Sequence, residues 1–168
     1  MEFLKQFEES EAGFRVIAEK LMNEYLIQTY DSKFRITELE FYWNSPTHKD
    51  MSTYERKYID PEVGEWFFHY SGVDIALKSA EGRGGILIRK IYDIEKEKTY
   101  PGPLICAMRL FSGTNAFAST IMTKLVEHNF PTNATIKNDK RTGLGKNAEE
   151  NGAHNFPYRF FIDINKLK

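Results

Sequence analysis

The stretch FRITELEFYW, residues 34–43, decides how this chain folds. It is rich in β-branched and aromatic side chains, which favour extended backbone. The turn-forming sequence Asp31-Ser32-Lys33 precedes it, and residues 26–30 before that turn also favour extended backbone. We therefore expect residues 26–43 to form a β-hairpin.

The sequence on either side of this hairpin predicts a helix before it and a mixture of strands and helices after it. Phe14, Ile17 and Leu21 recur at helical spacing, which predicts a helix within the first 30 residues. Further strands are expected over residues 66–70, 75–78, 86–92 and 158–164. A helix is expected over 102–111, helical or irregular structure over 114–129, and loops over 44–62 and 137–152. This order is typical of a single α+β domain, residues 1–168, with mostly antiparallel strands.

Composition excludes several classes of protein. The chain has 168 residues, and none of its apolar runs approaches the ~20 residues of a membrane span. Its acidic N-terminus lacks the pattern of a signal peptide, and its single cysteine, Cys106, allows no internal disulfide. A cytoplasmic protein is therefore expected. The net charge of −1 excludes a globally basic nucleic-acid coat but leaves room for a local basic patch.

Glutamates alternate with apolar residues in the stretch 38–42. With a period of two, Glu38, Glu40 and Tyr42 share one face of the strand, and Leu39 and Phe41 share the other. One interpretation is a solvated strand face. The other is a carboxylate beside aromatic walls, where partial desolvation tunes it as a general base.

The run WFFHY, residues 66–70, allows two interpretations. It is either a strand buried on both faces or a wall on which a planar ring stacks; nucleobases stack on aromatic side chains at roughly 1–3 kcal/mol each.

Three further patterns bear on ligand binding. The sequence GRGG, residues 82–85, precedes a strand, so we interpret it as a hairpin turn and not as a phosphate loop. The four histidines show no metal-ligand spacing, and no metal site is expected. Four basic residues fall within ten positions, in a segment whose glycines at 143 and 145 allow close approach of a ligand. They form either a solvated loop or a patch for phosphate: Lys137, Lys140, Arg141 and Lys146.

Taken in order, these segments resemble the alkyladenine (3-methyladenine) DNA glycosylase family. The stretch ELEFY (38–42) is similar to the family's ETEAY-like strand, and GEWFFHYSG (64–72) to its G-x-x-Y-V-Y-x-x-Y-G strand. GGILIR (84–89) resembles G-A-V-L-L-R, and Gly102-Pro103-Leu104 resembles a helix start of the family. RTGLG (141–145) and PYRF (157–160) resemble its ending. The resemblance runs from about residue 14 to residue 164.

The resemblance implies a curved antiparallel sheet, no metal, no cofactor, and excision of an alkylated or deaminated purine that is flipped out of double-stranded DNA. It implies that Glu40 activates the water that attacks the sugar C1′, in a protein that acts as a monomer. By the same resemblance, the base is bound by Tyr42, His48, Phe68, Lys78, Thr142 and Gly143. The DNA contacts it implies are Tyr70, Ser71, Arg89, Lys140 and Arg141.

Some positions depart from the family pattern. Ser71 stands where the family has a wedge tyrosine, with Tyr70 one residue earlier, and Lys78 replaces an asparagine that helps to select the base. Two alternatives therefore stay open: a non-catalytic relative that binds nucleic acid or a nucleobase, and a small-molecule nucleosidase that uses Glu38 with Glu40. The orientation of Glu38 distinguishes the nucleosidase from the single-base mechanism. We also expect a basic surface beside the pocket, formed by Arg89 and the four basic residues of segment 137–146, with Lys78 inside the cleft.

Overall fold

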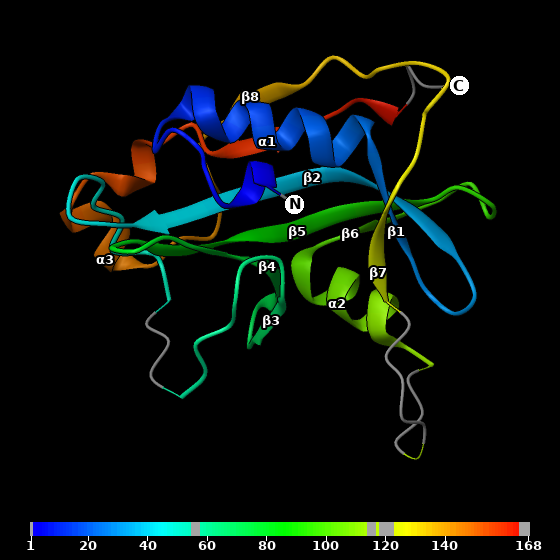
Figure 1. Ribbon diagram of the computed structural model, residues 1–168, viewed down its shortest axis with the longest axis horizontal. Coiled ribbons are helices and arrows are strands. Elements are labelled where there is room, and N and C mark those ends of the chain that lie inside the picture. The colour runs from blue at the N-terminus through cyan, green and yellow to red at the C-terminus, as the bar shows by residue number, and fades with distance from the viewer. Residues whose placement is uncertain (1, 55–57, 114–116, 118–122, 165–168) are drawn as a thin grey trace.

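The computed structural model describes residues 2–54, 58–113, 117 and 123–164 (Figure 1). Within these residues the helices are η1 (Glu2–Leu4), α1 (Glu11–Asn23), α2 (Pro103–Phe111), α3 (Lys146–Glu150) and η2 (Ala153–Asn155). The strands are β1 (Tyr25–Gln28), β2 (Lys33–Asn44), β3 (Trp66–His69), β4 (Gly72–Lys78), β5 (Arg83–Asp93), β6 (Lys98–Pro101), β7 (Lys124–Glu127), β8 (Lys137–Asp139) and β9 (Arg159–Phe161).

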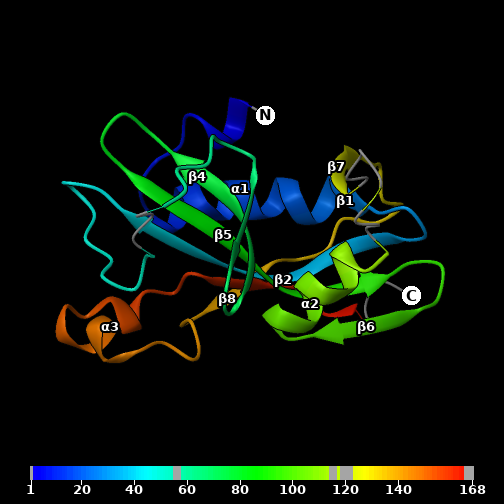
Figure 2. The same cartoon turned by 90° about the horizontal axis from the view of Figure 1, so that it is seen from below.

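These strands form one sheet in the order β3-β4-β5-β2-β1-β7, in which β6 pairs with β5, and β9 pairs with both β2 and β8. The pairs formed by the described residues are all antiparallel. The long strand β2 is central, since it pairs with β1, β5 and β9. Figures 1 and 2 show the sheet curling. The predicted α+β class with a curved, mostly antiparallel sheet is confirmed.

Helix α1 covers one face of this sheet, as its apolar spacing predicts. Ser10 caps the helix, because its hydroxyl accepts a hydrogen bond from the backbone N–H three residues later. Phe14, Ile17 and Leu21 are buried in the core. Phe14 stacks on Phe41 of β2 with ring centroids 4.7 Å apart. The Leu39–Phe41 face of β2 is therefore the core face beneath α1.

The opposite face of β2 carries Glu40 and Tyr42, because successive side chains of a strand point to opposite faces. Helix α2 lies on this second face, packed against β4 and β5 (Figures 1 and 2). It buries Cys106, Ala107 and Leu110 there. The two faces therefore differ in kind, with a continuous apolar core under α1 and a polar region beside α2.

The glycines of the 82–85 sequence differ from the predicted turn. Ser79 and Gly82 close the turn with two hydrogen bonds, but Gly84 and Gly85 lie inside β5. A Cβ on Gly84 would collide with the carbonyl oxygen of Tyr42, and one on Gly85 would approach the Asp74 carboxylate to 2.5 Å. Both glycines are therefore needed where β5 passes its neighbours closely.

Three other predictions need correction. Strand β3 is not buried on both faces, because it forms the edge of the sheet and its side chains are partly exposed. Residues 124–127 form β7, and not the helical or irregular structure predicted over 114–129; residues 114–116 and 118–122 lie outside the described residues. The expected loop 137–152 contains β8 and α3. In the described part of the chain, no helix is long and apolar enough to cross a membrane.

Candidate functional site

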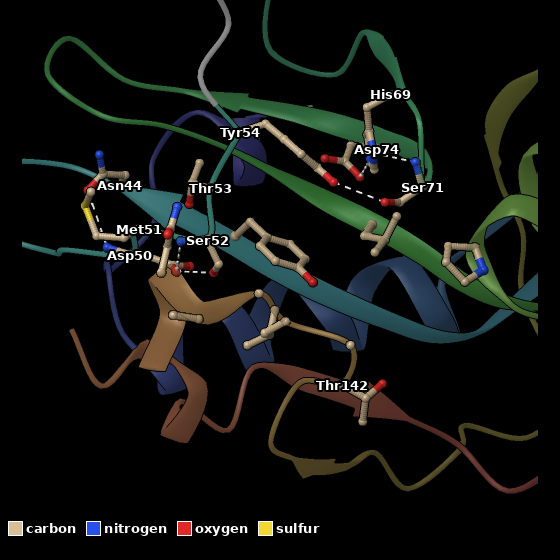
Figure 3. A pocket seen from close by; sticks show the side chains of 18 of the residues that line it. Asn44, Asp50, Met51, Ser52, Thr53, Tyr54, His69, Ser71, Asp74 and Thr142 are labelled. Carbon is tan, nitrogen blue, oxygen red and sulfur yellow. Dashed lines mark hydrogen bonds and ion pairs between the residues drawn. The ribbon is translucent and has the colours of Figure 1, made fainter. Parts of the chain in front are cut away.

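A pocket of about 620 Å³ opens on the polar face of the sheet (Figure 3). Its floor comes from β2, β4 and β5, and its walls come from the segments around residues 50–54, 69–71 and 142–148 and from the start of α2. The lining residues used below are Tyr42, Asp50, Tyr54, His69, Tyr70, Ser71, Asp74, Arg89, Thr142, Gly143 and Lys146. This volume lies within the range of small-molecule sites.

Glu40 lies directly behind this lining, with a side chain that is 0% exposed. Its Oε2 accepts hydrogen bonds from the Tyr42 hydroxyl at 2.8 Å and from Arg89 Nη1 at 3.0 Å. Its Oε1 accepts the backbone N–H of Thr142 at 3.0 Å. Three residues that line the pocket therefore hold the carboxylate, and the Tyr42 hydroxyl connects it to the pocket.

Burial raises the pKa of Glu40, while the charge of Arg89 and the hydrogen bonds from Thr142 and Tyr42 act in the opposite direction. Arg89 and the amide can only donate, so the arrangement matches an ionised acceptor. Burial and the neighbouring Glu40 charge also raise the pKa of the Tyr42 hydroxyl far above its usual value. Tyr42 is therefore a protonated donor to a carboxylate, and not a phenolate.

Glu38 lies two residues before Glu40 but takes no part in the pocket lining. Its carboxylate pairs with Lys90 Nζ at 2.6 Å, Arg89 Nε at 3.5 Å and Arg159 Nη1 at 3.7 Å. It is buried and held by cations, so it neither faces solvent nor stands beside Glu40 in the pocket. This placement argues against a reaction that uses both glutamates.

A second polar cluster forms the wall across the pocket, at the β3–β4 hairpin (Figure 3). His69 Nε2 lies 3.0 Å from Asp74 Oδ1, and the Ser71 backbone N–H donates to His69 Nδ1 at 3.3 Å. The Tyr54 hydroxyl lies 3.1 Å from Ser71 Oγ, and its ring lies 4.6 Å from the His69 ring. Sequence reasoning did not single out Asp74; its signal is one acidic residue between apolar neighbours in β4.

His48 and Phe68 do not line this pocket, so the prediction that they form part of its base-binding wall is wrong. His48 packs instead against Phe14, Phe156 and Tyr158, with ring centroids 5.4–6.1 Å away, and partial burial lowers its pKa. Phe68 is 52% exposed on the edge strand, with its ring 4.6 Å from that of Phe111.

The predicted position of Lys78 inside the cleft is also wrong. Its ammonium group pairs with Asp60 and Glu62, at 3.0 Å each, and Lys78 does not line the pocket. Carboxylates close to the end of β4 thus neutralise the charge that would repel a cationic ligand.

Arg141 does not join a basic surface, because its side chain is 0% exposed. It forms an ion pair with the equally buried Asp50, with Nη1–Oδ2 and Nη2–Oδ1 distances of 2.6 and 3.2 Å, and its guanidinium lies 4.6 Å from the Tyr42 ring centroid. The pair anchors the segment that carries Thr142. Lys140, one residue away, is exposed and bonds Asn155.

The remaining predicted residues are placed as follows. Tyr70, which is 83% exposed, Ser71, Thr142 and Gly143 line the pocket. Arg89 lines it as well but is engaged by both Glu38 and Glu40. Lys137 and Lys146 are exposed. The described residues contain no group of three or more His, Cys, Asp or Glu side chains that could hold a metal ion.

Comparison of the chain with models of known protein families and with curated protein sequences finds no match.

Proposed function

We propose that this protein is a monofunctional DNA N-glycosylase that excises an alkylated or deaminated purine. The observation that carries this proposal is the Glu40–Tyr42 pair, in which a buried carboxylate accepts a hydrogen bond from the hydroxyl of a pocket-lining tyrosine at 2.8 Å. Hydrolysis of an N-glycosidic bond requires a base that accepts a proton from water. The pair supplies that base at the floor of a pocket large enough for a purine.

The chemistry of the pocket suits a planar, polar ring. Tyr42, Tyr54, His69 and Tyr70 bring aromatic side chains to its lining. Bases stack on such side chains irrespective of their sequence, and a base removed from the duplex needs this replacement for the stacking it loses.

In the proposed reaction, a water bound next to the Tyr42 hydroxyl attacks C1′ of the sugar. The bond between the water oxygen and C1′ forms as the C1′–N bond breaks, and the electron pair of that bond leaves with the base. Tyr42 takes the water proton while passing its own proton to Oε2 of Glu40. A purine that is alkylated at N3 or N7 carries positive charge and therefore leaves as a neutral base. A neutral deaminated purine leaves as its anion, which takes a proton from water.

Arg89 and Thr142 tune this base without taking a proton. Burial raises the pKa of Glu40, and the charge of Arg89 lowers it and so opposes the effect of burial. The backbone N–H of Thr142 fixes the other carboxylate oxygen, and Arg89 Nη1 also donates to the Thr142 carbonyl oxygen at 3.3 Å. The carboxylate therefore keeps one orientation toward Tyr42.

Exposed lysines support duplex DNA as the partner. Lys146 lines the pocket, and Lys137 and Lys140 are exposed on the segment that leads to Thr142 and Gly143. The exposed Tyr70 also lines the pocket. Lysines at these positions can contact phosphates on either side of an extruded nucleotide.

A second candidate function is nucleobase binding without catalysis. It is favoured by the complete burial of Glu40, whose two oxygens already accept three hydrogen bonds. In this alternative the glutamate orients Tyr42 and Arg89, and the pocket retains a base without hydrolysing its glycosidic bond.

Duplex oligonucleotides that carry hypoxanthine, ethenoadenine or 7-methylguanine distinguish the two. The glycosylase forms abasic sites in at least one duplex, and Glu40→Gln, which keeps the shape but cannot accept a proton, forms none while it still binds the duplex. Binding of a lesion by the wild-type protein without abasic sites establishes the second candidate instead. Equal excision by Glu40→Gln and wild type contradicts the assignment of Glu40.

A further inference from the structure

Asp74 is a second carboxylate of the pocket, and the mechanism proposed above does not use it. It lies on β4, in the cluster with His69 and Ser71, with a side chain that is 7% exposed (Figure 3). Unlike Glu40, it lines the pocket directly. Its neighbours on this wall are the aromatic side chains of Tyr54, His69 and Tyr70.

The hydrogen bonds of His69 fix its protonation and leave one oxygen of Asp74 available. Because the Ser71 N–H donates to Nδ1, the ring proton lies on Nε2, which donates to Asp74 Oδ1. Asp74 Oδ2 accepts no hydrogen bond from the residues that the structure describes. It lies over Gly85, where a Cβ would approach it to 2.5 Å. The hairpin and the missing side chain of Gly85 together position this oxygen.

The other charged groups of the lining are largely compensated by ion pairs. Asp50 pairs with Arg141, and Arg89 pairs with Glu40 behind the lining. Lys146 is exposed at the start of α3. A ligand beside the hairpin therefore meets the Asp74 carboxylate and aromatic rings, and both attract positive charge.

We infer that Asp74 is the specificity-determining residue of the pocket, selecting a positively charged, N-alkylated purine over a neutral one, and that His69 positions it. The inference rests on the proposed function, whose substrate it narrows to cationic bases that present an N–H donor to Oδ2. His69 is a positioning residue and not a proton donor to substrate, because both of its ring nitrogens are engaged within the hairpin.

Equilibrium binding of two isomeric nucleosides tests this inference. 1-Methyladenosine is positively charged at neutral pH, and N6-methyladenosine is neutral. We expect the wild-type protein to bind the charged isomer about tenfold more tightly or better, the effect of a charge-assisted hydrogen bond. Asp74→Asn should remove this preference and leave the affinity for N6-methyladenosine unchanged. Glu62→Gln changes the net charge equally, outside the pocket, and should preserve it.

The variant His69→Gln tests whether His69 positions Asp74 or only supports the fold. It should reduce the preference for the charged isomer while the affinity for the neutral isomer persists. Equal wild-type affinities for the two isomers, no binding of either, or a preference that survives Asp74→Asn would each overturn the inference. The comparison of wild-type affinities decides it even if a variant does not fold. The binding experiment does not measure excision, so the two proposals can fail separately. A binding preference in a protein that forms no abasic sites refutes only the proposed glycosylase activity. Excision by a protein without the binding preference refutes only this inference.

Discussion

The pocket region holds two carboxylates in opposite ways, with Glu40 behind the floor and Asp74 at the β3–β4 hairpin. Both oxygens of Glu40 are occupied, one by Thr142 and the other by Tyr42 and Arg89, and its side chain is 0% exposed. Asp74 lines the pocket and has one oxygen held by a neutral histidine. The difference teaches that the same chemical group can be saturated by donors behind the lining or left with an oxygen facing the pocket, and our proposals give the first carboxylate the role of base and the second the role of ligand contact.

Removing the Tyr42 hydroxyl, which connects Glu40 to the pocket, should have the largest effect on the rate of excision. In Tyr42→Phe, the carboxylate keeps Arg89 and Thr142 but loses its connection to the pocket. We expect excision to slow by about 10²–10⁴, the usual contribution of general base catalysis. Single-turnover kinetics on a damaged duplex measure this loss. The double variant with Glu40→Gln should lose little more, since both residues act as one unit, and additive losses would contradict the relay.

Removing the buried cation Arg141 should destabilise the fold, because its ion pair with Asp50 anchors the segment that carries Thr142. Arg141→Met leaves Asp50 buried and uncompensated, so the free energy of unfolding should fall by about 3–5 kcal/mol. Urea denaturation measures it, with Lys140→Ala as the matched control. That neighbouring lysine is exposed, and its removal should change stability by at most about 0.5 kcal/mol. Equal effects of the two variants would contradict the buried pair.

The pH dependence of excision tests the protonation of Glu40 and the effect of Arg89 on it. Because burial raises the Glu40 pKa, the base is ionised only above its ordinary range, and excision should rise with pH through an apparent pKa higher than 4.5. Arg89→Met removes the charge that opposes this shift, so the rise should move to higher pH. A pH–rate profile that Arg89→Met leaves in place would contradict the role of Arg89.

The same shift links Glu40 to stability. A carboxyl whose pKa is raised by folding contributes stability below the pKa of the unfolded chain, and this contribution is lost as the pH rises through the folded pKa. Glu40→Gln should therefore remove one contribution to the unfolding free energy that declines as the pH rises through the acidic range. Chemical denaturation at several pH values measures this change.

The exposed lysines should have the smallest effects. Lys140→Ala should weaken duplex binding modestly and lower the log–log salt slope by about 0.9 if that ammonium contacts one phosphate. Fluorescence titrations at about 50 and 200 mM salt measure the slope. An unchanged slope would contradict a contact between Lys140 and a DNA phosphate. It would not bear on the pocket residues, which the nucleoside binding experiment tests.

Local patterns predicted the parts of this molecule that depend on neighbouring residues. The period of two in ELEFY placed Glu40 and Tyr42 on one face, and helical spacing placed Phe14 and Leu21 on the buried face of α1. Both are properties of a single element, and tertiary packing did not override them.

Long-range packing decided what the sequence did not show. Arg141 was expected on the surface but meets Asp50, which is 91 residues away along the chain. His48 was expected in the pocket, but the aromatic rings around it come from α1 and from the segment before β9. Asp74 meets His69 across a hairpin turn, and no pattern within either strand specifies that contact.

One comparison tests the central claim most directly. Glu40 and Glu38 lie two residues apart on β2, and only Glu40 reaches the pocket through Tyr42. The rate of abasic-site formation in a damaged duplex is measured for wild type, Glu40→Gln and Glu38→Gln, with folding of each confirmed by circular dichroism. Our account predicts that Glu40→Gln abolishes excision and that Glu38→Gln retains a rate near that of wild type. Comparable losses in both variants, or undiminished excision by Glu40→Gln, would contradict it.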